Sequence, residues 1–221
     1  MANREPVGGF ILAGGRSSRM SRPKGLLKLA GQPMVVHIAQ VLESTGEARE
    51  AVRDGEAEVA AAMMKPVIIG PPDVYEGLGY RVVRDDDENM GPLGGISTAL
   101  RIATCEWSLV VGCDLPFLRR EWLEFLMARA KASTADVVIP LNERGFEPLC
   151  AMYRKRARAA IAEALDRGVR KVTDGLAGVA LATIAPAEWK GFDACGQLFK
   201  NVNTPEDYDE ARGSLREGTG S

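Results

Sequence analysis

Histidine and closely spaced cysteine are scarce in this sequence. Its 221 residues include one histidine, His37, which lies in the apolar helical pattern MVVHIAQVL and is interpreted as a locally satisfied helix residue. The four cysteines, Cys105, Cys113, Cys150 and Cys195, are far apart and form no Cys-x-x-Cys pair. The sequence therefore gives no support to a histidine-based triad, a zinc site or a disulfide framework, and we expect reduced thiols.

Large net charge and long hydrophobic runs are also missing. The formal net charge is −2, so no global field attracts nucleic acid or an anionic membrane. The apolar runs are shorter than a membrane span, and the N-terminus has no signal-peptide pattern. We therefore expect a cytoplasmic protein that binds neither nucleic acid nor membranes.

An alternation of apolar segments and helical patterns predicts an α/β fold. Segments with strand character are Val7–Leu12, Pro66–Gly70, Arg81–Asp85, Trp107–Asp114, Ala135–Leu141 and Pro148–Tyr153. Helical patterns cover Met34–Glu43, Gly95–Ala103, Glu121–Ala132 and Lys155–Asp166. Strands such as SLVVGC are continuously apolar, as expected when helices cover both faces of a parallel sheet. The prediction is a doubly wound, mostly parallel sheet with helices on both faces.

One domain is expected over residues 1–212. Residues 213–221 are small and polar and are predicted to form a disordered tail. The alanine- and glutamate-rich segment Gly46–Lys65 is long for a connection between a helix and a strand. It either extends a helix or forms a flap.

The stretch GFILAGGRSSRMSRPKGLLKL, residues 9–29, joins a strand end to a cationic loop. Gly14 and Gly15 permit a tight turn or the close approach of a ligand. The cations that follow are Arg16, Arg19, Arg22, Lys24 and Lys28. The loop matches neither the Walker A pattern nor the G-x-G-x-x-G fingerprint. A local cationic loop on a nearly neutral chain favours a small anionic ligand, and a solvated surface loop is the alternative.

Two aspartates are the last residues of predicted strands. Asp114 ends the strand in VVGCDLPFL, and Asp85 ends the strand in VVRDDDENM. Ligands of doubly wound sheets bind beyond the carboxyl ends of the strands, where Gly14, Asp85 and Asp114 all fall. Asp114 is either a turn-forming or helix-capping residue or a ligand of Mg²⁺, which needs only one or two protein carboxylates.

Several motifs together carry a family resemblance. With LAGGRSSRM, PKGLLKLAGQPM, GPLGG, CDLPF and NVNTPED, the sequence resembles the molybdenum cofactor guanylyltransferases, or molybdopterin-guanine dinucleotide synthases, a family of nucleotidyltransferases. The resemblance covers the chain from Gly9 to about Tyr208. It implies a Rossmann-like nucleotidyltransferase fold and the transfer of GMP from Mg·GTP to the terminal phosphate of molybdopterin or Mo-molybdopterin, with release of pyrophosphate. Cytidylyl-transferring relatives carry Leu-Ala-Ala-Gly where this chain has Leu-Ala-Gly-Gly, which points to GTP.

The resemblance also implies roles for individual residues. Those implied to bind the nucleotide are Leu12, Ala13, Gly14, Gly15, Arg19, Lys24, Asp85 and Asp114. Lys24 is implied to contact the phosphates, and Arg19 the β- or γ-phosphate. Lys24 and Asp114 are the implied catalytic residues, with Asp114 as the ligand of the cofactor Mg²⁺.

The resemblance also implies residues that bind the acceptor substrate, and the chain departs from the family at one position. Asn201 and Asn203 match asparagines implicated in holding the pterin. Gly70 stands where some members have an asparagine, so any side-chain contact made there is missing or supplied otherwise. Implied partners are GTP, molybdopterin, and molybdoenzyme apoproteins or their chaperones.

Two other functions stay open at this point. The chain is alternatively a nucleotidyltransferase of the same fold with another substrate pair, such as a sugar phosphate acceptor or CTP as donor. The third possibility is a non-catalytic module that binds GTP or the cofactor and delivers it to a partner enzyme. The presence of both Lys24 and Asp114 favours catalysis, because binding alone requires no metal ligand beside the leaving group.

Overall fold

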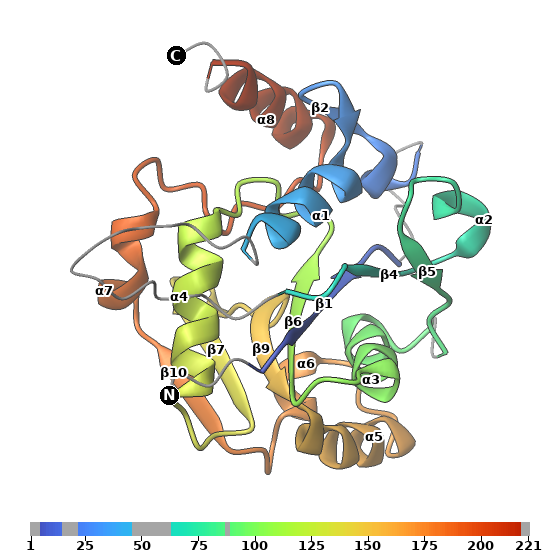
Figure 1. The fold of residues 1–221 in the computed structure, drawn as a ribbon, viewed down its shortest axis with the longest axis vertical. Helices are drawn as coiled ribbons and strands as arrows, with labels where there is room; N and C mark the ends of the chain where they lie inside the picture. Colours follow the sequence, from blue (N-terminus) through green and yellow to red (C-terminus); the bar gives the residue numbers. More distant parts are fainter. Residues whose placement is uncertain (1–4, 15–21, 46–62, 87–88, 218–221) are drawn as a thin grey trace.

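A mixed, mostly parallel sheet forms the centre of the molecule, as the sequence predicts (Figure 1). The structure, a computed structural model, describes residues 5–14, 22–45, 63–86 and 89–217. The sheet has the strand order β10-β7-β9-β6-β1-β4-β5. Its strands are β1 (Val7–Leu12), β4 (Val67–Ile69), β5 (Arg81–Val83), β6 (Trp107–Gly112), β7 (Val137–Asn142), β9 (Cys150–Arg154) and β10 (Leu181–Ile184).

Two short strands and a hairpin complete the β-structure. Strand β8 (Gly145–Phe146) pairs with β7, and β2 (Lys28–Leu29) pairs with β3 (Gln32–Pro33) in a separate hairpin. In the main sheet, β9 runs antiparallel to both β6 and β7, and β8 runs antiparallel to β7, whereas the other described neighbours are parallel. Because β9 is antiparallel, β6 and β7 run in the same direction and their carboxyl ends lie at one edge of the sheet.

Helices cover both faces of the sheet (Figure 1). The α-helices are α1 (Met34–Ser44), α2 (Pro72–Tyr75), α3 (Pro92–Ile102), α4 (Arg120–Lys131), α5 (Arg158–Asp166), α6 (Val172–Gly175), α7 (Pro186–Trp189) and α8 (Pro205–Glu217). Short 3₁₀ helices cover Lys24–Leu26, Lys155–Ala157 and Lys190–Phe192. No helix in the described ranges is long and apolar enough to span a bilayer.

The alternation of side chains along β1 divides the core in two. Val7 and Ile11 pack in one cluster with residues of α1 and α4, including Ile38 and Trp122. Phe10 and Leu12 point to the opposite face and pack with residues of α3 and α5. Since all six residues of β1 are buried, the strand is covered on both faces, which explains why its sequence lacks polar alternation.

The order of the strands creates a switch point beside β1. The chain moves from β1 to β4 and β5 on one side and then returns to β6 on the other side. Doubly wound sheets bind ligands where the strand order reverses in this way. The segments after β1 and β6 therefore begin a candidate site at the carboxyl edge.

Some boundaries differ from the sequence prediction. The predicted disorder of residues 213–221 is wrong for residues 213–217, which continue helix α8, and residues 218–221 lie outside the described residues. Helix α3 begins at Pro92, three residues earlier than predicted, because Gly91 turns the chain with a φ of +65° and proline suits the first helical position. Most of the long segment Gly46–Lys65 also lies outside the described residues, and only its end is seen, where the Met64 N–H donates to the Val7 carbonyl.

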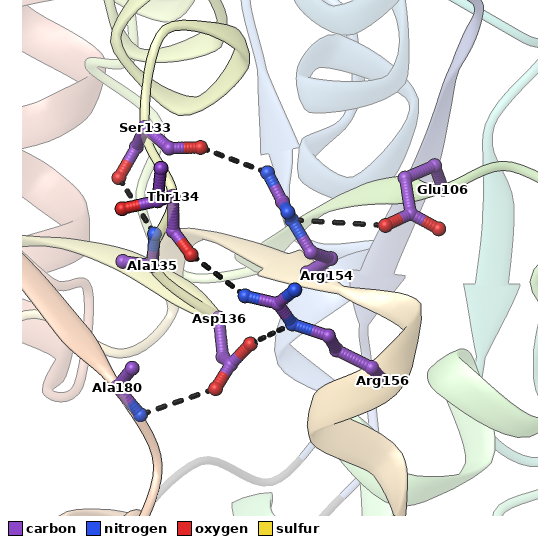
Figure 2. Close-up of polar contacts among 8 residues, drawn as sticks. All are labelled: Glu106, Ser133, Thr134, Ala135, Asp136, Arg154, Arg156 and Ala180. Carbon is purple, nitrogen blue, oxygen red and sulfur yellow. Dashed lines mark hydrogen bonds and ion pairs between the residues drawn. The ribbon is translucent and has the colours of Figure 1, made fainter.

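A polar cluster joins the strands at the opposite edge of the sheet (Figure 2). This basal cluster consists of Glu106, Ser133, Thr134, Ala135, Asp136, Arg154, Arg156 and Ala180. Arg156 donates to the Asp136 carboxylate, which also accepts from the Ala180 N–H at 3.2 Å. Arg154 donates to the Ser133 carbonyl at 2.8 Å and stacks on Trp107. The cluster thus links the chain before β7 with β9 and β10, far along the strands from the switch point.

Candidate active site

Lys24, Asp114 and Asn203 meet at the carboxyl edge of the sheet. The Lys24 Nζ lies 3.6 Å from Asp114 Oδ2 and donates to Asn203 Oδ1 at 2.5 Å. The main chain adds to this contact, because the Val202 N–H donates to the Asp114 carbonyl at 2.9 Å. The structure therefore brings together three residues that the sequence singles out, from three separate motifs.

Asp114 has an environment that favours a cation. Its side chain and that of Lys24 are each 22% exposed. Burial raises the pKa of Asp114, and the charge and hydrogen bond of Lys24 act in the opposite direction. Its Oδ1 lies over Gly112, where a Cβ would come within 2.7 Å of that oxygen. Glycine at this position thus leaves room for the carboxylate.

The main chain after β1 is held in place from several sides. The Ala13 N–H donates to the Ile69 carbonyl at 2.8 Å, and the Tyr75 hydroxyl donates to the Ala13 carbonyl at 3.1 Å. At Gly14, a Cβ would meet no described atom within 4 Å, so no described side chain crowds the backbone there. Gly15 and Arg19, two further predicted nucleotide contacts, lie outside the described residues.

Gly70 has a packing reason that the sequence does not reveal. A Cβ at Gly70 would lie 3.2 Å from the Ala13 carbonyl carbon and 3.2 Å from the Tyr75 ring. A larger residue would press on the segment that follows β1. The close packing of the Ala13 backbone and the Tyr75 ring against Gly70 therefore gives a reason for glycine at this position.

Asp85 lies after β5, beside the first turns of α3. Its Oδ1 accepts from the buried Thr98 hydroxyl at 3.0 Å, which itself accepts from the Asp86 N–H. A Cβ at Gly95 would lie 3.6 Å from Asp85 Oδ2 and 3.1 Å from Leu12. Asp85 and Leu12 thus border the same part of α3, and Asp86 pairs with Arg101 on the exposed side.

His37 contacts the loop that follows Asp114. Its Nε2 lies 3.0 Å from the Pro116 carbonyl, so the ring N–H donates to the loop that follows Asp114. The prediction of a satisfied helix histidine is confirmed, but the partner is 79 residues away rather than local.

Helix α8 positions Asn203 through its first turn. Asp207 Oδ2 accepts from the N–H groups of Asn203 and Thr204, both at 2.9 Å, and the Thr204 hydroxyl accepts from the Asp207 N–H at 3.2 Å. This reciprocal arrangement is a capping box that begins at Thr204. The hydrogen bond from the Asn203 N–H is the main cause of the lowered pKa of Asp207. Asn201 lies on the same segment, two residues before Asn203.

Comparison with known proteins shows the family of this chain. Residues 9–180 match the family model of the MobA-like NTP transferase domain. The chain belongs to this family. A probable molybdenum cofactor guanylyltransferase of Pelotomaculum thermopropionicum is 33% identical over 204 residues, which are 92% of this chain and 91% of that protein. One of Natronomonas pharaonis is 33% identical over 213 residues, with 94% and 97% covered. The resemblance seen in the motifs is thereby confirmed, and the MobA-like chain is a nucleotidyltransferase.

Solved structures agree with the fold. Molybdopterin-guanine dinucleotide biosynthesis protein A from Archaeoglobus fulgidus superimposes with a TM-score of 0.77 at 22% identity, over 96% of this chain and 100% of that one. The 2-C-methyl-D-erythritol 4-phosphate cytidylyltransferase of Thermus thermophilus gives a TM-score of 0.67 at 15% identity, with 95% and 98% covered. The predicted α/β nucleotidyltransferase fold is confirmed.

The MobA-like site fits Mg²⁺ with few protein ligands. The described residues contain no group of three or more His, Cys, Asp or Glu side chains arranged to hold a metal. Mg²⁺ commonly binds one or two carboxylates and completes its octahedron with phosphate oxygens and water. The partly buried Asp114, whose side chain pairs with Lys24, suits such a role.

The sequence prediction missed Glu147. This partly buried carboxylate follows β8 and lies near Asp114, and burial together with the charge of Asp114 raises its pKa to about 7. The Asn142 amide donates to Glu147 Oε2 at 3.3 Å. The available signal is weak: an acid between Phe146 and Pro148 in GFEPLC, at the start of a buried strand.

Proposed function

We propose that this chain transfers GMP from Mg·GTP to the terminal phosphate of molybdopterin or Mo-molybdopterin. An oxygen of the acceptor phosphate attacks the α-phosphorus in line, the bond to the β-phosphate breaks, and pyrophosphate leaves. The product is the guanine dinucleotide form of the cofactor. The observation that carries the proposal is the contact of Lys24 with both Asp114 and Asn203 at the switch point of a MobA-like chain.

The chemistry requires positioning and charge neutralisation more than a protein nucleophile. A phosphate monoester is already ionised at neutral pH, so the reaction does not depend on a histidine base. Lys24 binds the phosphates and compensates the negative charge that grows on the leaving group. Asp114 would hold Mg²⁺, and the metal would supply polarisation of the phosphate oxygens. The nucleotide is held on the β1–β5 side of Asp114 by Leu12, Ala13, Gly14 and Asp85.

Asn203 receives a refined role in this proposal. Its amide oxygen accepts from the Lys24 ammonium, and its backbone N–H donates to Asp207. These two contacts support a role in orienting Lys24, in addition to the acceptor contact that the family resemblance implies. Asn201 then remains the candidate for the pterin contact. Molybdoenzyme apoproteins or their chaperones are the proposed recipients of the product.

A direct assay tests the proposal. The purified protein is supplied with molybdopterin and Mg²⁺ together with GTP, CTP or ATP, and pyrophosphate release and product mass are measured. We expect rapid release with GTP and a product one GMP heavier than molybdopterin. Equal rates with CTP would refute the donor assignment. Transfer to a sugar 1-phosphate but not to molybdopterin would refute the acceptor assignment, and nucleotide binding without any transfer would indicate a delivery module.

A further inference from the structure

The side of Asp114 that faces away from Lys24 borders the β8–β9 turn, residues 147–149. Asp114 Oδ2 is directed toward Lys24, whereas Oδ1 and the Leu149 side chain both lie within 3.4 Å of the position that a Gly112 Cβ would occupy. The Gly112 N–H donates to the Leu149 carbonyl at 2.9 Å, which holds the turn against the end of β6. The segment around Leu149 is therefore fixed next to the reacting centre.

In-line transfer explains why this side matters. The attacking and leaving oxygens stand on opposite sides of the α-phosphorus. If the acceptor phosphate reacts beside Lys24 and Asn203, the pterin end of the acceptor extends away from them, toward the other side of Asp114. Among the described residues, the β8–β9 turn borders Asp114 on that other side through Leu149.

Glu147 is the acidic group that this turn presents. Its backbone is fixed at both ends, because its N–H donates to the Pro140 carbonyl at 2.9 Å and its carbonyl accepts from the Cys150 N–H at 3.2 Å. Its side chain accepts from the Asn142 amide and from the Leu149 N–H. A carboxylate has about four acceptor positions, so these two donors leave capacity for two more hydrogen bonds.

We propose that Glu147 positions the acceptor by accepting hydrogen bonds from N–H groups of its pterin ring. The inference rests on the proposed function, which supplies the pterin as substrate. The amino group and the neighbouring ring N–H of a pterin form a pair of donors whose spacing matches the two oxygens of a carboxylate. Asn142 fixes the orientation of the carboxylate, and the partly buried position strengthens the hydrogen bonds that it makes.

The test compares Glu147→Gln with Glu143→Gln, a control on the preceding β7–β8 turn whose side chain is exposed. In Glu147→Gln we expect the KM for molybdopterin to rise about tenfold, the scale of one charge-assisted hydrogen bond. The KM for GTP, the Mg²⁺ requirement and kcat at saturating acceptor should stay within about twofold. Equilibrium dialysis of molybdopterin without GTP should show the same weakening, and the control should match the parent.

The outcomes separate this inference from the proposed function. A parent protein that transfers GMP, with an unchanged KM and unchanged dialysis in Glu147→Gln, would overturn the role of Glu147 alone. A raised Mg²⁺ requirement with normal molybdopterin binding would instead make Glu147 a metal ligand and overturn it as well. A parent that binds no molybdopterin would overturn both. Should Glu147→Gln fail to fold, Asn142→Ala replaces it, with a smaller rise in the same KM expected.

Discussion

Lys24 contacts two side chains of different charge. The ammonium pairs with the partly buried Asp114 and donates to the neutral amide of Asn203. An ion pair with 22% exposed side chains is screened less than one at the surface. Lys24 is thus oriented before any phosphate binds, which is the arrangement that electrostatic catalysis requires.

Replacing Lys24 by alanine should reduce turnover strongly. Loss of one preorganised electrostatic group typically costs about 10²–10³ in kcat. Arginine should restore only part of the rate, because its planar fork does not reproduce a compact ammonium. The measurement is kcat under saturating Mg·GTP, with the melting temperature as a fold control. Lys28→Ala, which removes an exposed lysine four residues on, should behave like the parent. A folded Lys24→Ala protein within threefold of the parent rate would contradict the role.

Asp114→Asn should nearly abolish turnover while the protein remains folded. An amide cannot supply the charge that Mg²⁺ requires. Burial already raises the pKa of Asp114 and disfavours its charged form, so the neutral amide avoids a desolvation cost that offsets the loss of the Lys24 pair. Turnover and Mn²⁺ binding by electron paramagnetic resonance are the measurements. Normal Mn²⁺ affinity in the variant would remove Asp114 from the metal site.

At the scale of elements, the start of α8 connects stability to the site. The capping box of Thr204 and Asp207 satisfies N–H groups at the helix end and also fixes the backbone of Asn203. A helix terminus therefore controls where the partner of Lys24 lies, although the helix itself is peripheral (Figure 1).

Asp207→Ala should lower the free energy of unfolding by about 1 kcal/mol at neutral pH. The hydrogen bond from the Asn203 N–H, with the others at this carboxylate, lowers the pKa of Asp207. Its contribution is therefore complete above the unfolded value near pH 4 and is lost as pH falls through the lower folded pKa. Denaturant unfolding at pH 7 and pH 3 measures both effects, and the difference from the parent should shrink at pH 3. Asp209→Ala, at an exposed position, is the control, and an equal loss in both variants would contradict the capping role.

At the scale of the whole molecule, chemistry and structural support lie at opposite edges of one sheet. Lys24, Asp114 and Asn203 gather at the carboxyl edge, and the basal cluster joins β7, β9 and β10 at the other edge (Figures 1 and 2). The central strands β1 and β6 between the two edges are buried and continuously hydrogen-bonded. Such a rigid frame allows the two edges to be changed independently.

Asp136→Asn should therefore reduce stability without changing kinetics. Burial opposes the charge of Asp136, but the hydrogen bonds from Arg156 and the Ala180 N–H lower its pKa on balance. Because the Arg156 side chain is 55% exposed, the expected cost is only about 1 kcal/mol. Denaturant unfolding and steady-state kinetics are measured together, with the exposed Asp166→Asn as control. A change in the KM for GTP beyond twofold would show that the two edges are coupled.

The secondary structure of the centre was largely predictable because its signals are local. All six predicted strands are present, since continuous apolar runs such as those of β1 and β6 are typical of buried parallel strands. Strand β10 was missed because three of its four residues are at least partly exposed and its pattern is weak. The antiparallel direction of β9 was also not predictable, because direction depends on the length and path of the connections.

The sequence by itself determined the strand-end positions of Asp85 and Asp114, the glycine turn after β1 and the family to which they belong. These features depend on neighbouring residues, whose periodicity and turn chemistry can be read along the chain. Only the tertiary structure decided that Lys24 contacts Asn203, 179 residues away, and that Glu147 is partly buried near Asp114. Such contacts follow from the order of the strands in the sheet and from burial. The free energy of a charged group depends on its burial and on the charges and hydrogen-bond donors around it, not on its neighbours in sequence.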